Sequence, residues 1–384
     1  MPEKNKSGEK VAGKNAKSPL KVMHICGSPK RAGTEKVFLR FVTAQRRDET
    51  YSVMPVVAQG SWLEKNLRER GIPHESVKFP QGVSGLLARL FGGKTKKNLE
   101  EIINNHKPDI IQNWAGPSSM FIPKTRCPQV ARVGLSMPPK YTRNARLIAC
   151  ATQSVCDHLR HKGVPPEKLR HIPTLINIPP KGFEDFRYDV RAEYSIPHEA
   201  HVVLLLGRLQ EDKGFDVALF ALNMLPENIH ALIVGEGPEH AGLEDAVEAD
   251  NLHGRVHFSG WIDNLTPIFA AADSFLLPSR RQSSCNVILE AWAHRLPVVA
   301  TEIESVRALA THDETAVLIP AEDEVAIAKE VGKLAADPRR ATALAKAGHK
   351  YVREVFSEPA ILQAYDTLYR DALTGHNPAE DSTK

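Results

Sequence analysis

The sequence predicts an α/β protein made of two Rossmann-like domains in series. Short apolar runs alternate with amphipathic helical stretches along most of the 384 residues, a pattern typical of a parallel sheet covered on both faces. A chain of this length accommodates two domains at roughly 100–200 residues each. The alternation pauses once, at 173–198, where several prolines and the lack of a long apolar run predict a linker.

The first domain is expected at 20–180, after a lysine-rich tail at 1–19 that we expect to be disordered. Helices are expected from Glu35 and at 62–70. The expected strands are short apolar runs, each followed by polar or helical sequence, at 21–27, 52–60, 109–117 and 146–152, with a shorter apolar piece around Val77.

The second domain is expected at 181–356, where the alternation is stronger. A long helical stretch begins at Glu324, and 376–384 is expected to be a second disordered tail. The expected strands lie at 201–209, 230–237, 255–260, 274–279, 296–301 and 316–320. Two such domains create a cleft between the carboxyl ends of their sheets, where open α/β sheets bind ligands.

Composition excludes several classes of protein. No run approaches the roughly 18 apolar residues that a membrane-spanning helix needs, and the polar N-terminus lacks the apolar region of a signal peptide. The five cysteines are scattered and form no C-x-x-C pair, which argues against a disulfide framework and a zinc site and favours the cytoplasm.

The charge is distributed unevenly between the two halves. Residues 1–180 contain 31 lysines and arginines against 13 acidic residues, a net charge of +18, whereas residues 181–384 carry −14. This asymmetry indicates an anionic partner for the first half: nucleic acid, an anionic membrane surface or a phosphorylated substrate. Simple solvation of each half by its own charges is the alternative. Nucleic acid is the weakest candidate, because no basic motif with interleaved aromatic residues is recognisable.

Two loops of the second domain carry candidate binding residues. In GRLQEDKGFD (207–216), Arg208 and Lys213 lie between a strand and a helix N-terminus, which suits a phosphate or diphosphate. In the loop and helix at 278–301, the backbone N–H groups of 284–287 can hold an anion, and Glu290 can accept hydrogen bonds from a ribose diol. Surface charge in the first loop and a buried structural carboxylate at Glu290 are the alternatives.

The loop GSPKRAGTE (27–35) is similar to a P-loop only superficially. Gly33 is followed by Thr34, so the required G-K-[ST] is missing. The pair Gly235 and Gly237 does not complete a G-x-G-x-x-G, because position 240 is His. ATP- and NAD-type fingerprints therefore both fail, and Gly33 instead suits the close approach of a ligand across the cleft.

Taken together, several segments resemble the retaining glycosyltransferases of the GT-B fold, in the large class called family 4. The segments are GRLQEDKGFD, VGEGPEHAGLE, VHFSGWID, ADSFLLPSRR and NVILEAWAHRLPVVAT, and the resemblance extends over about 21–372. It implies two Rossmann-like domains facing across a cleft, with a C-terminal helix at 357–375 that crosses back to the N-terminal domain.

The resemblance also implies roles for individual residues. Arg208, Lys213 and Gly33 would meet the donor diphosphate, and Glu290 with Val287 at the helix N-terminus would bind the ribose side. The residues expected at the donor sugar are Gln282, Ser284, Cys285 and Asn286. Backbone groups around Trp261 and Ile262 would form the edge that meets the nucleobase.

Two departures from the family pattern stand out. Gln282 occupies the place of the first glutamate of the family's glutamate pair, which keeps hydrogen-bonding capacity but removes the charge. The segment 131–144, where the family often has a histidine facing the donor sugar, contains none. Gln282 therefore leaves a non-catalytic sugar-nucleotide-binding or partner subunit open as the alternative function.

The reaction implied by the resemblance is transfer of a sugar from a nucleoside diphosphate to a glycan or lipid-linked acceptor with retention of configuration, in bacterial envelope polysaccharide or lipopolysaccharide assembly. No Asp-x-Asp motif occurs, so no metal or other cofactor is expected, and Arg208 and Lys213 would stabilise the departing diphosphate. An epimerase or phosphorylase of the same fold is a rival, although no lysine lies in a recognisable pyridoxal-phosphate context.

The acceptor is expected on the basic N-terminal domain. GLLARLFGGKTKK (85–97) combines an apolar helical face with Lys94, Lys96 and Lys97. Such a segment suits an anionic bilayer and equally suits a helix packed on its own sheet. With the first alternative, the protein would be peripheral on the cytoplasmic face of the inner membrane.

Overall fold

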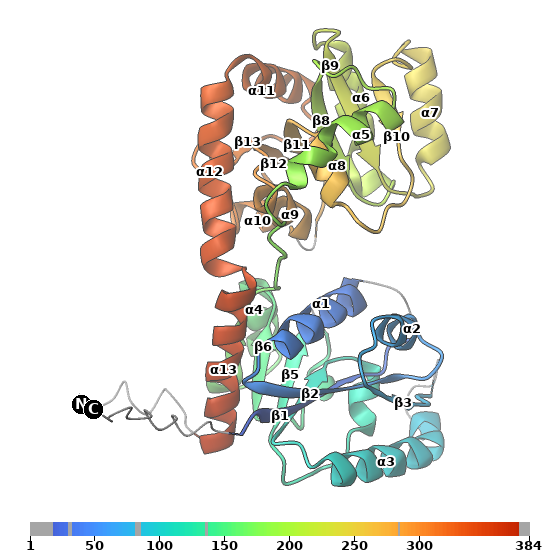
Figure 1. Cartoon of the computed structure of the whole chain (residues 1–384), viewed down its shortest axis with the longest axis vertical. Coiled ribbons are helices and arrows are strands. Elements are labelled where there is room, and N and C mark those ends of the chain that lie inside the picture. The colour runs from blue at the N-terminus through green and yellow to red at the C-terminus, as the bar shows by residue number, and fades with distance from the viewer. Residues whose placement is uncertain (1–17, 30–32, 81–85, 135–136, 283–284, 376–384) are drawn as a thin grey trace, which may run out of the picture. The chain divides into compact units, whose positions relative to one another are not determined.

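The computed structural model describes residues 18–29, 33–80, 86–134, 137–282 and 285–375 (Figure 1). Apart from Ser18 and Pro19, the two expected tails lie outside these ranges. The chain forms two compact units: unit 1 is Met1–Ile172 with Tyr365–Lys384, and unit 2 is Pro173–Ala364. The boundary precedes the one drawn at residue 180 from the sequence, because Ile176 is fully buried in the core of unit 2.

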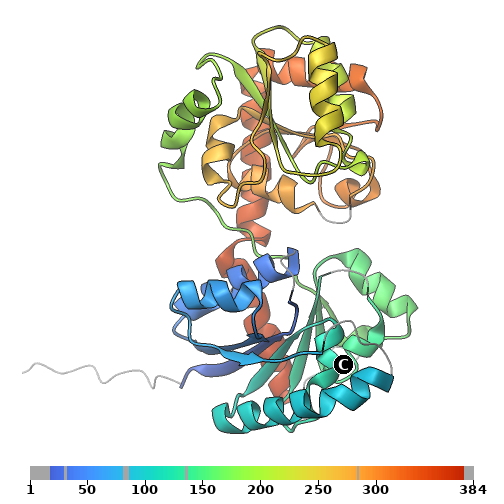
Figure 2. The same ribbon diagram turned by 90° about the vertical axis from the view of Figure 1, so that its right-hand side faces the viewer.

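Unit 1 contains a parallel sheet in the order β3-β2-β1-β4-β5-β6-β7. The strands are β1 (Leu20–Cys26), β2 (Tyr51–Ala58), β3 (Glu75–Val77), β4 (Ile110–Trp114), β5 (Gln129–Val133), β6 (Leu147–Cys150) and β7 (Leu169–His171). The helices are α1 (Gly33–Arg47), α2 (Trp62–Glu69), α3 (Leu86–His106) and α4 (Gln153–His161), with 3-10 turns η1 (Pro117–Phe121), η2 (Pro139–Tyr141) and η3 (Pro166–Lys168). Helices cover both faces of the sheet in each unit (Figure 2).

Unit 2 contains a second parallel sheet in the order β10-β9-β8-β11-β12-β13. Its strands are β8 (His201–Leu206), β9 (Ile229–Val234), β10 (Val256–Phe258), β11 (Ser274–Leu277), β12 (Val298–Thr301) and β13 (Val317–Ile319). Its helices are α5 (Phe186–Glu193), α6 (Phe215–Asn223), α7 (His240–Ala249), α8 (Thr266–Ala271), α9 (Asn286–Ala293), α10 (Glu304–Arg307), α11 (Glu324–Ala336) and α12 (Pro338–Val355), with 3-10 turns η4 (Phe183–Asp185) and η5 (Glu211–Lys213).

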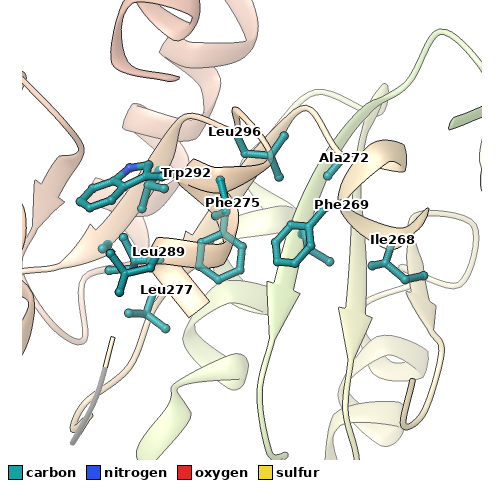
Figure 3. Packing of buried hydrophobic residues seen from close by; sticks show 14 of the residues in the cluster. Ile268, Phe269, Ala272, Phe275, Leu277, Leu289, Trp292 and Leu296 are labelled. Atoms are coloured by element: carbon teal, nitrogen blue, oxygen red, sulfur yellow. The ribbon is translucent and has the colours of Figure 1, made fainter. Parts of the chain in front are cut away.

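The sheet of unit 2 is buried on both faces. Along β8, Val202 and Leu204 point into one apolar cluster and Val203 and Leu205 into the other, as a central parallel strand requires. On the first face, apolar side chains of α8, β11 and α9 pack together against the sheet (Figure 3). They include Phe269, Phe275, Leu289 and Trp292. This packing fixes α9, whose N-terminus lies at the loop after β11.

The last helix, α13 (Glu358–Thr374), packs its second half on unit 1, and this confirms the predicted return of the C-terminal helix. Tyr365 and Tyr369 are at most 1% exposed. The Tyr369 hydroxyl donates to Oε1 of Gln112 on β4, and Nε2 of Gln45 on α1 donates to Tyr369 at 3.5 Å. Among the described helices, none has the length and apolarity needed to cross a bilayer.

Candidate functional site

The sheet of unit 2 has a topological switch point between β8 and β11. From β8 the chain winds outward through β9 and β10, and it then returns to the other side of β8 with β11, β12 and β13. In open α/β sheets, ligands bind outside the carboxyl ends of the strands at such a point. The loops at 207–214 and 278–285, which hold most of the predicted site residues, follow these two strands.

Lys213 and Gln282, predicted from separate loops, lie in contact. Nζ of Lys213 donates to Oε1 of Gln282 at 2.8 Å and to Oδ2 of Asp212 at 2.9 Å. The Lys213 side chain is 18% exposed, so the ammonium group is held at the surface by one neutral and one charged acceptor. Arg208 is exposed at the start of the same loop, and no ion pair involves it within the ranges that the structure describes.

Two glycines allow these loops to approach one another. Gly214 has φ = 66°, and a Cβ there would lie 2.2 Å from the carbonyl oxygen of Pro278, in the loop after β11. Gly235 has φ = 143°, and a Cβ would lie 1.8 Å from the carbonyl oxygen of Gly207. Only glycine tolerates both the backbone conformation and the contact. The two glycines therefore allow the loops to converge.

Helix α9 begins at Asn286, and the residues predicted around its N-terminus are only partly available. Cys285 is 8% exposed and belongs to the apolar core, and burial raises the pKa of its thiol. Its side chain therefore faces the core, and its backbone is what it can offer a ligand. Asn286, Val287 and Glu290 are half-buried, with Glu290 one turn after Asn286. Ser284 lies outside the described residues.

The residues predicted for the nucleobase edge follow β10. Trp261 is 49% exposed, and its Nε1 donates to Oδ1 of Asp263 at 3.1 Å. Ile262 is partly buried against the apolar core. The N–H of Gly235 donates to the carbonyl oxygen of Gly260 at 2.8 Å, so this segment lies beside the loop after β9.

Other predicted residues lie in unit 1. Gly33 is the first residue of α1, and apart from its chain neighbours and its own helix backbone, no atom of the described residues lies within 4 Å of where its Cβ would be. Lys94, Lys96 and Lys97 are exposed on α3, whereas the side chains of 86–91, which carry the expected apolar face, lie outside the described part. Within the described ranges, no three His, Cys, Asp or Glu side chains gather as a metal site would require.

The sequence reasoning missed the acidic and basic residues that join the two loops. Arg280, after β11, forms a two-bond ion pair with Asp216 on α6 and a second ion pair with Glu322 after β13. These residues are far apart in sequence, and only the strand order brings them together. The signal available beforehand was an Arg-Arg pair directly before Gln282 and an acidic residue at the start of α6.

The strand orders, with the loops that converge at the switch point of unit 2, define the class of doubly wound, Rossmann-like α/β proteins with two such units. Residues 200–337 match the family described as Glycosyl transferases group 1. A lipopolysaccharide core biosynthesis glycosyltransferase of Rhizobium meliloti, LpsE, is 30% identical over 270 residues, which cover 70% of this chain and 77% of that protein. The chain belongs to this glycosyltransferase family.

Further relatives agree with this assignment. LpsD of the same organism, also a lipopolysaccharide core biosynthesis glycosyltransferase, is 28% identical over 359 residues, 91% of this chain and 98% of that protein. A glycosyltransferase from Rickettsia africae has a TM-score of 0.79 at 17% identity, covering 94% of this chain and 100% of that one. HepE of Anabaena, solved with UDP, has a TM-score of 0.74 at 19% identity, covering 91% and 99%. The predicted GT-B class of two Rossmann-like domains is confirmed.

Proposed function

We propose that this glycosyltransferase moves a sugar from a nucleoside diphosphate donor to a glycan or lipid-linked acceptor, with retention of configuration, during assembly of the lipopolysaccharide core. The observation that carries the proposal is the Lys213–Gln282 contact at 2.8 Å, at the switch point of a unit that belongs to the family. The names of the two Rhizobium relatives support the choice of acceptor class.

Each loop at the carboxyl ends of these strands would bind one part of the donor. Arg208 and Lys213 would neutralise the diphosphate, and Glu290 would accept hydrogen bonds from the ribose. The loop that contains Trp261 and Ile262 would meet the base. The sugar would lie against Gln282 and the backbone at the start of α9, where unpaired helical N–H groups favour negative partial charge. The proposal includes no metal ion, because the two cations supply positive charge at the leaving group.

The reaction would be a substitution on one face of the sugar. The bond from the anomeric carbon to the diphosphate oxygen breaks while the bond to the acceptor oxygen forms on the same side. A diphosphate oxygen takes the proton of the acceptor hydroxyl, so no protein base is needed. Lys213 would stabilise the charge that grows on the leaving diphosphate, and this is an interaction stronger in the transition state than in the ground state.

The acceptor would bind unit 1, which carries most of the excess positive charge. The exposed Lys94, Lys96 and Lys97 would attract an anionic bilayer, at about 1 kcal/mol for each cation near the surface. The protein would then work on the cytoplasmic face of the inner membrane. Pelleting with phosphatidylglycerol vesicles should weaken when all three lysines are changed to Gln, and unchanged pelleting would remove this segment from the proposal.

Donor binding is tested by thermal unfolding with UDP, GDP and ADP. A nucleotide at about 100 times its dissociation constant should add roughly 2.7 kcal/mol to the free energy of unfolding. Arg208→Ala should abolish the shift. Arg339→Ala, which removes an exposed arginine on α12, is the matched control and should leave the shift unchanged. The absence of a shift with every nucleotide would contradict the proposed donor site.

A further inference from the structure

Arg280 is the most heavily bonded cation at the edge of unit 2 that carries the candidate site. We propose that it is a positioning residue, which sets the ammonium group of Lys213 for the donor diphosphate. The inference rests on the proposed function and adds a residue that would not touch the donor itself. Three observations carry it: the geometry of the guanidinium, the backbone bonds beside it and the contacts of Lys213.

The guanidinium of Arg280 binds three different segments of the chain. Nη1 and Nη2 donate to the two carboxylate oxygens of Asp216 at 2.9 and 2.7 Å. Nη2 also donates to Oε2 of Glu322 at 2.9 Å, and Nε donates to Oε1 of the same carboxylate. Nη1 further donates to the carbonyl oxygen of Glu211 in η5. The planar guanidinium, with its five N–H donors, is the only side-chain group that can bind two carboxylates and a carbonyl oxygen at once.

The backbone beside Arg280 extends this link to Lys213. The N–H groups of Arg280 and Arg281 both donate to the carbonyl oxygen of Asp212, at 3.0 and 3.2 Å. Nζ of Lys213, the next residue, donates to Gln282 at 2.8 Å and lies 3.5 Å from the carbonyl oxygen of Arg281. The turn that carries Lys213 and the loop that receives its ammonium group are therefore both fixed by residue 280.

The charges at this junction are mutually stabilised. Hydrogen bonds to Asp216 and Glu322 raise the pKa of Arg280. Burial would raise the pKa of Asp216, but the hydrogen bonds and charge of Arg280 outweigh it, so that pKa lies below its ordinary value. Glu322 keeps a left-handed backbone, φ = 59°, which is uncommon for a residue other than glycine. Arg280 and Asp216 therefore each favour the charged form of the other, and their side chains point toward one another.

A second arginine of unit 2, Arg340, serves as a control, because it forms similar ion pairs that can contribute only to the stability of the fold. Arg340 binds Asp313 through Nη2 at 2.6 Å and Glu330 through Nη1 at 3.1 Å. Its side chain is 27% exposed, against 22% for Arg280. The two residues have the same chemistry and similar burial, but Arg340 joins α11, α12 and the segment before β13, and it has no bond to the turn of Lys213.

The test compares the dissociation constants of a nucleoside diphosphate and its monophosphate, measured by calorimetry with UDP and UMP, GDP and GMP, or ADP and AMP. Arg280→Ala should weaken diphosphate binding by about 10- to 100-fold, because a displaced charged group loses that much of its effect. The monophosphate lacks the second phosphate and should lose much less. Arg280→Lys keeps the charge but not the planar fork, so its dissociation constant for the diphosphate should lie between those of the unaltered protein and of Arg280→Ala. Arg340→Ala should change neither constant.

A thermodynamic cycle with Lys213→Ala separates positioning from folding. If Arg280 acts through Lys213, Arg280→Ala should add little to the loss already caused by Lys213→Ala. Additive losses, or equal weakening of diphosphate and monophosphate, would overturn the assignment while leaving the donor site in place. Failure of the unaltered protein to bind any of the three diphosphates would overturn the proposed function and the role of Arg280 together.

Discussion

Each unit has a switch point beside its first strand, between β1 and β4 in unit 1 and between β8 and β11 in unit 2, yet the loops there are built differently. In unit 2, Gly214 and Gly235 each lie where a Cβ would meet a backbone carbonyl oxygen, at 2.2 and 1.8 Å. In unit 1, a Cβ at Gly27 would meet the side chains of Ser118 and Phe79, whereas one at Gly33 would meet no described residue beyond its chain neighbours and its own helix. The same topology therefore provides a switch point in each unit, but in unit 2 the glycines let backbone segments of neighbouring loops pack directly on one another.

A second difference lies in the buried groups. In unit 1, Nε1 of Trp114 donates to Nδ1 of His24 at 3.2 Å, so Nε2 of His24 carries the proton and donates to Oε1 of Gln45 at 2.6 Å. Gln45 and Gln112 then meet Tyr369 of α13. The cluster of unit 2 in Figure 3 is apolar instead. We call this hydrogen-bonded set the polar seam. A helix packed on it must supply matching donors and acceptors, whereas a helix packed on an apolar face needs mainly a complementary shape.

The sharpest test of the loop comparison is an alanine in each unit. Gly235→Ala should destabilise unit 2 by about 4 kcal/mol, because it adds a strained φ to a backbone clash. Gly33→Ala should change the stability of unit 1 by less than about 0.5 kcal/mol. Amide hydrogen exchange measured by mass spectrometry reads each unit separately. Equal effects in the two units would show that the glycines do not distinguish the loops.

Acid should destabilise unit 2 more than unit 1. Burial lowers the pKa values of His257 and His294 in unit 2 to about 4, and does the same to His24 in unit 1. Further histidines with a lowered pKa are His201, His230 and His349 in unit 2 and His171 in unit 1. The unfolded chain therefore binds more protons between pH 6.5 and 4, and stability falls as the pH falls through that window.

The expected loss is on the order of 3 kcal/mol for one fully buried imidazole, and less for His257, which is partly exposed. Hydrogen exchange at several pH values between 7 and 4.5 measures it in each unit. His294→Asn removes one titrating group, so the pH dependence of unit 2 should become flatter. A steeper loss in unit 1 would contradict the comparison.

The polar seam predicts a smaller loss confined to unit 1. Tyr369→Phe removes the hydroxyl between Gln112 and Gln45 and should cost about 1–3 kcal/mol, because the buried amides lose a partner. Tyr351→Phe on α12 removes a half-buried hydroxyl from unit 2 and should cost under about 0.5 kcal/mol. Faster exchange in β4 and α13 after the first change alone would support the seam, and equal losses would not.

Most of the fold could be predicted from the sequence because its central strands are buried on both faces and therefore consist of short apolar runs. The strands that escaped prediction lack that signal. β5 (QVARV) contains Arg132, which is 5% exposed and donates to the carbonyl oxygen of Ile172 at 2.6 Å. β7 has only three residues, LRH. From the sequence alone, an arginine such as Arg132 indicates an exposed position, because the partner that allows its burial is supplied only by the tertiary structure.

The candidate site divides in the same way. Arg208, Lys213 and Glu290 were predicted because each lies in a loop or helix start that follows an expected strand, and Gln282 was predicted from the resemblance to the family's glutamate pair. The Lys213–Gln282 contact and the ion pairs of Arg280 were not, since they depend on β8 and β11 being neighbours. Cys285 was assigned to the sugar from its position in a motif, but the direction of its side chain is set by packing in the core.

The smallest expected change in stability, and the most informative change in function, comes from Gln282→Glu. The new carboxylate would lie where Oε1 is now, 2.8 Å from Nζ of Lys213, which Asp212 already contacts at 2.9 Å. A partly exposed pair of this kind is worth under about 1 kcal/mol of stability. The substitution also exchanges an amide donor for a charged acceptor, so the donor sugar meets a different partner.

We therefore expect Gln282→Glu to alter the ratio of kcat/KM between donors whose sugars are epimers, such as UDP-glucose and UDP-galactose, by about tenfold, the value of one hydrogen bond to a charged group. Gln282→Leu, which removes both hydrogen-bonding groups, shows how far the ratio moves when the side chain at 282 bonds neither Lys213 nor the sugar. An inactive unaltered protein that gains activity with Glu at 282 would instead identify a subunit that has lost catalysis. An active protein with an unchanged ratio would mean that the side chain at 282 serves Lys213 and not the sugar.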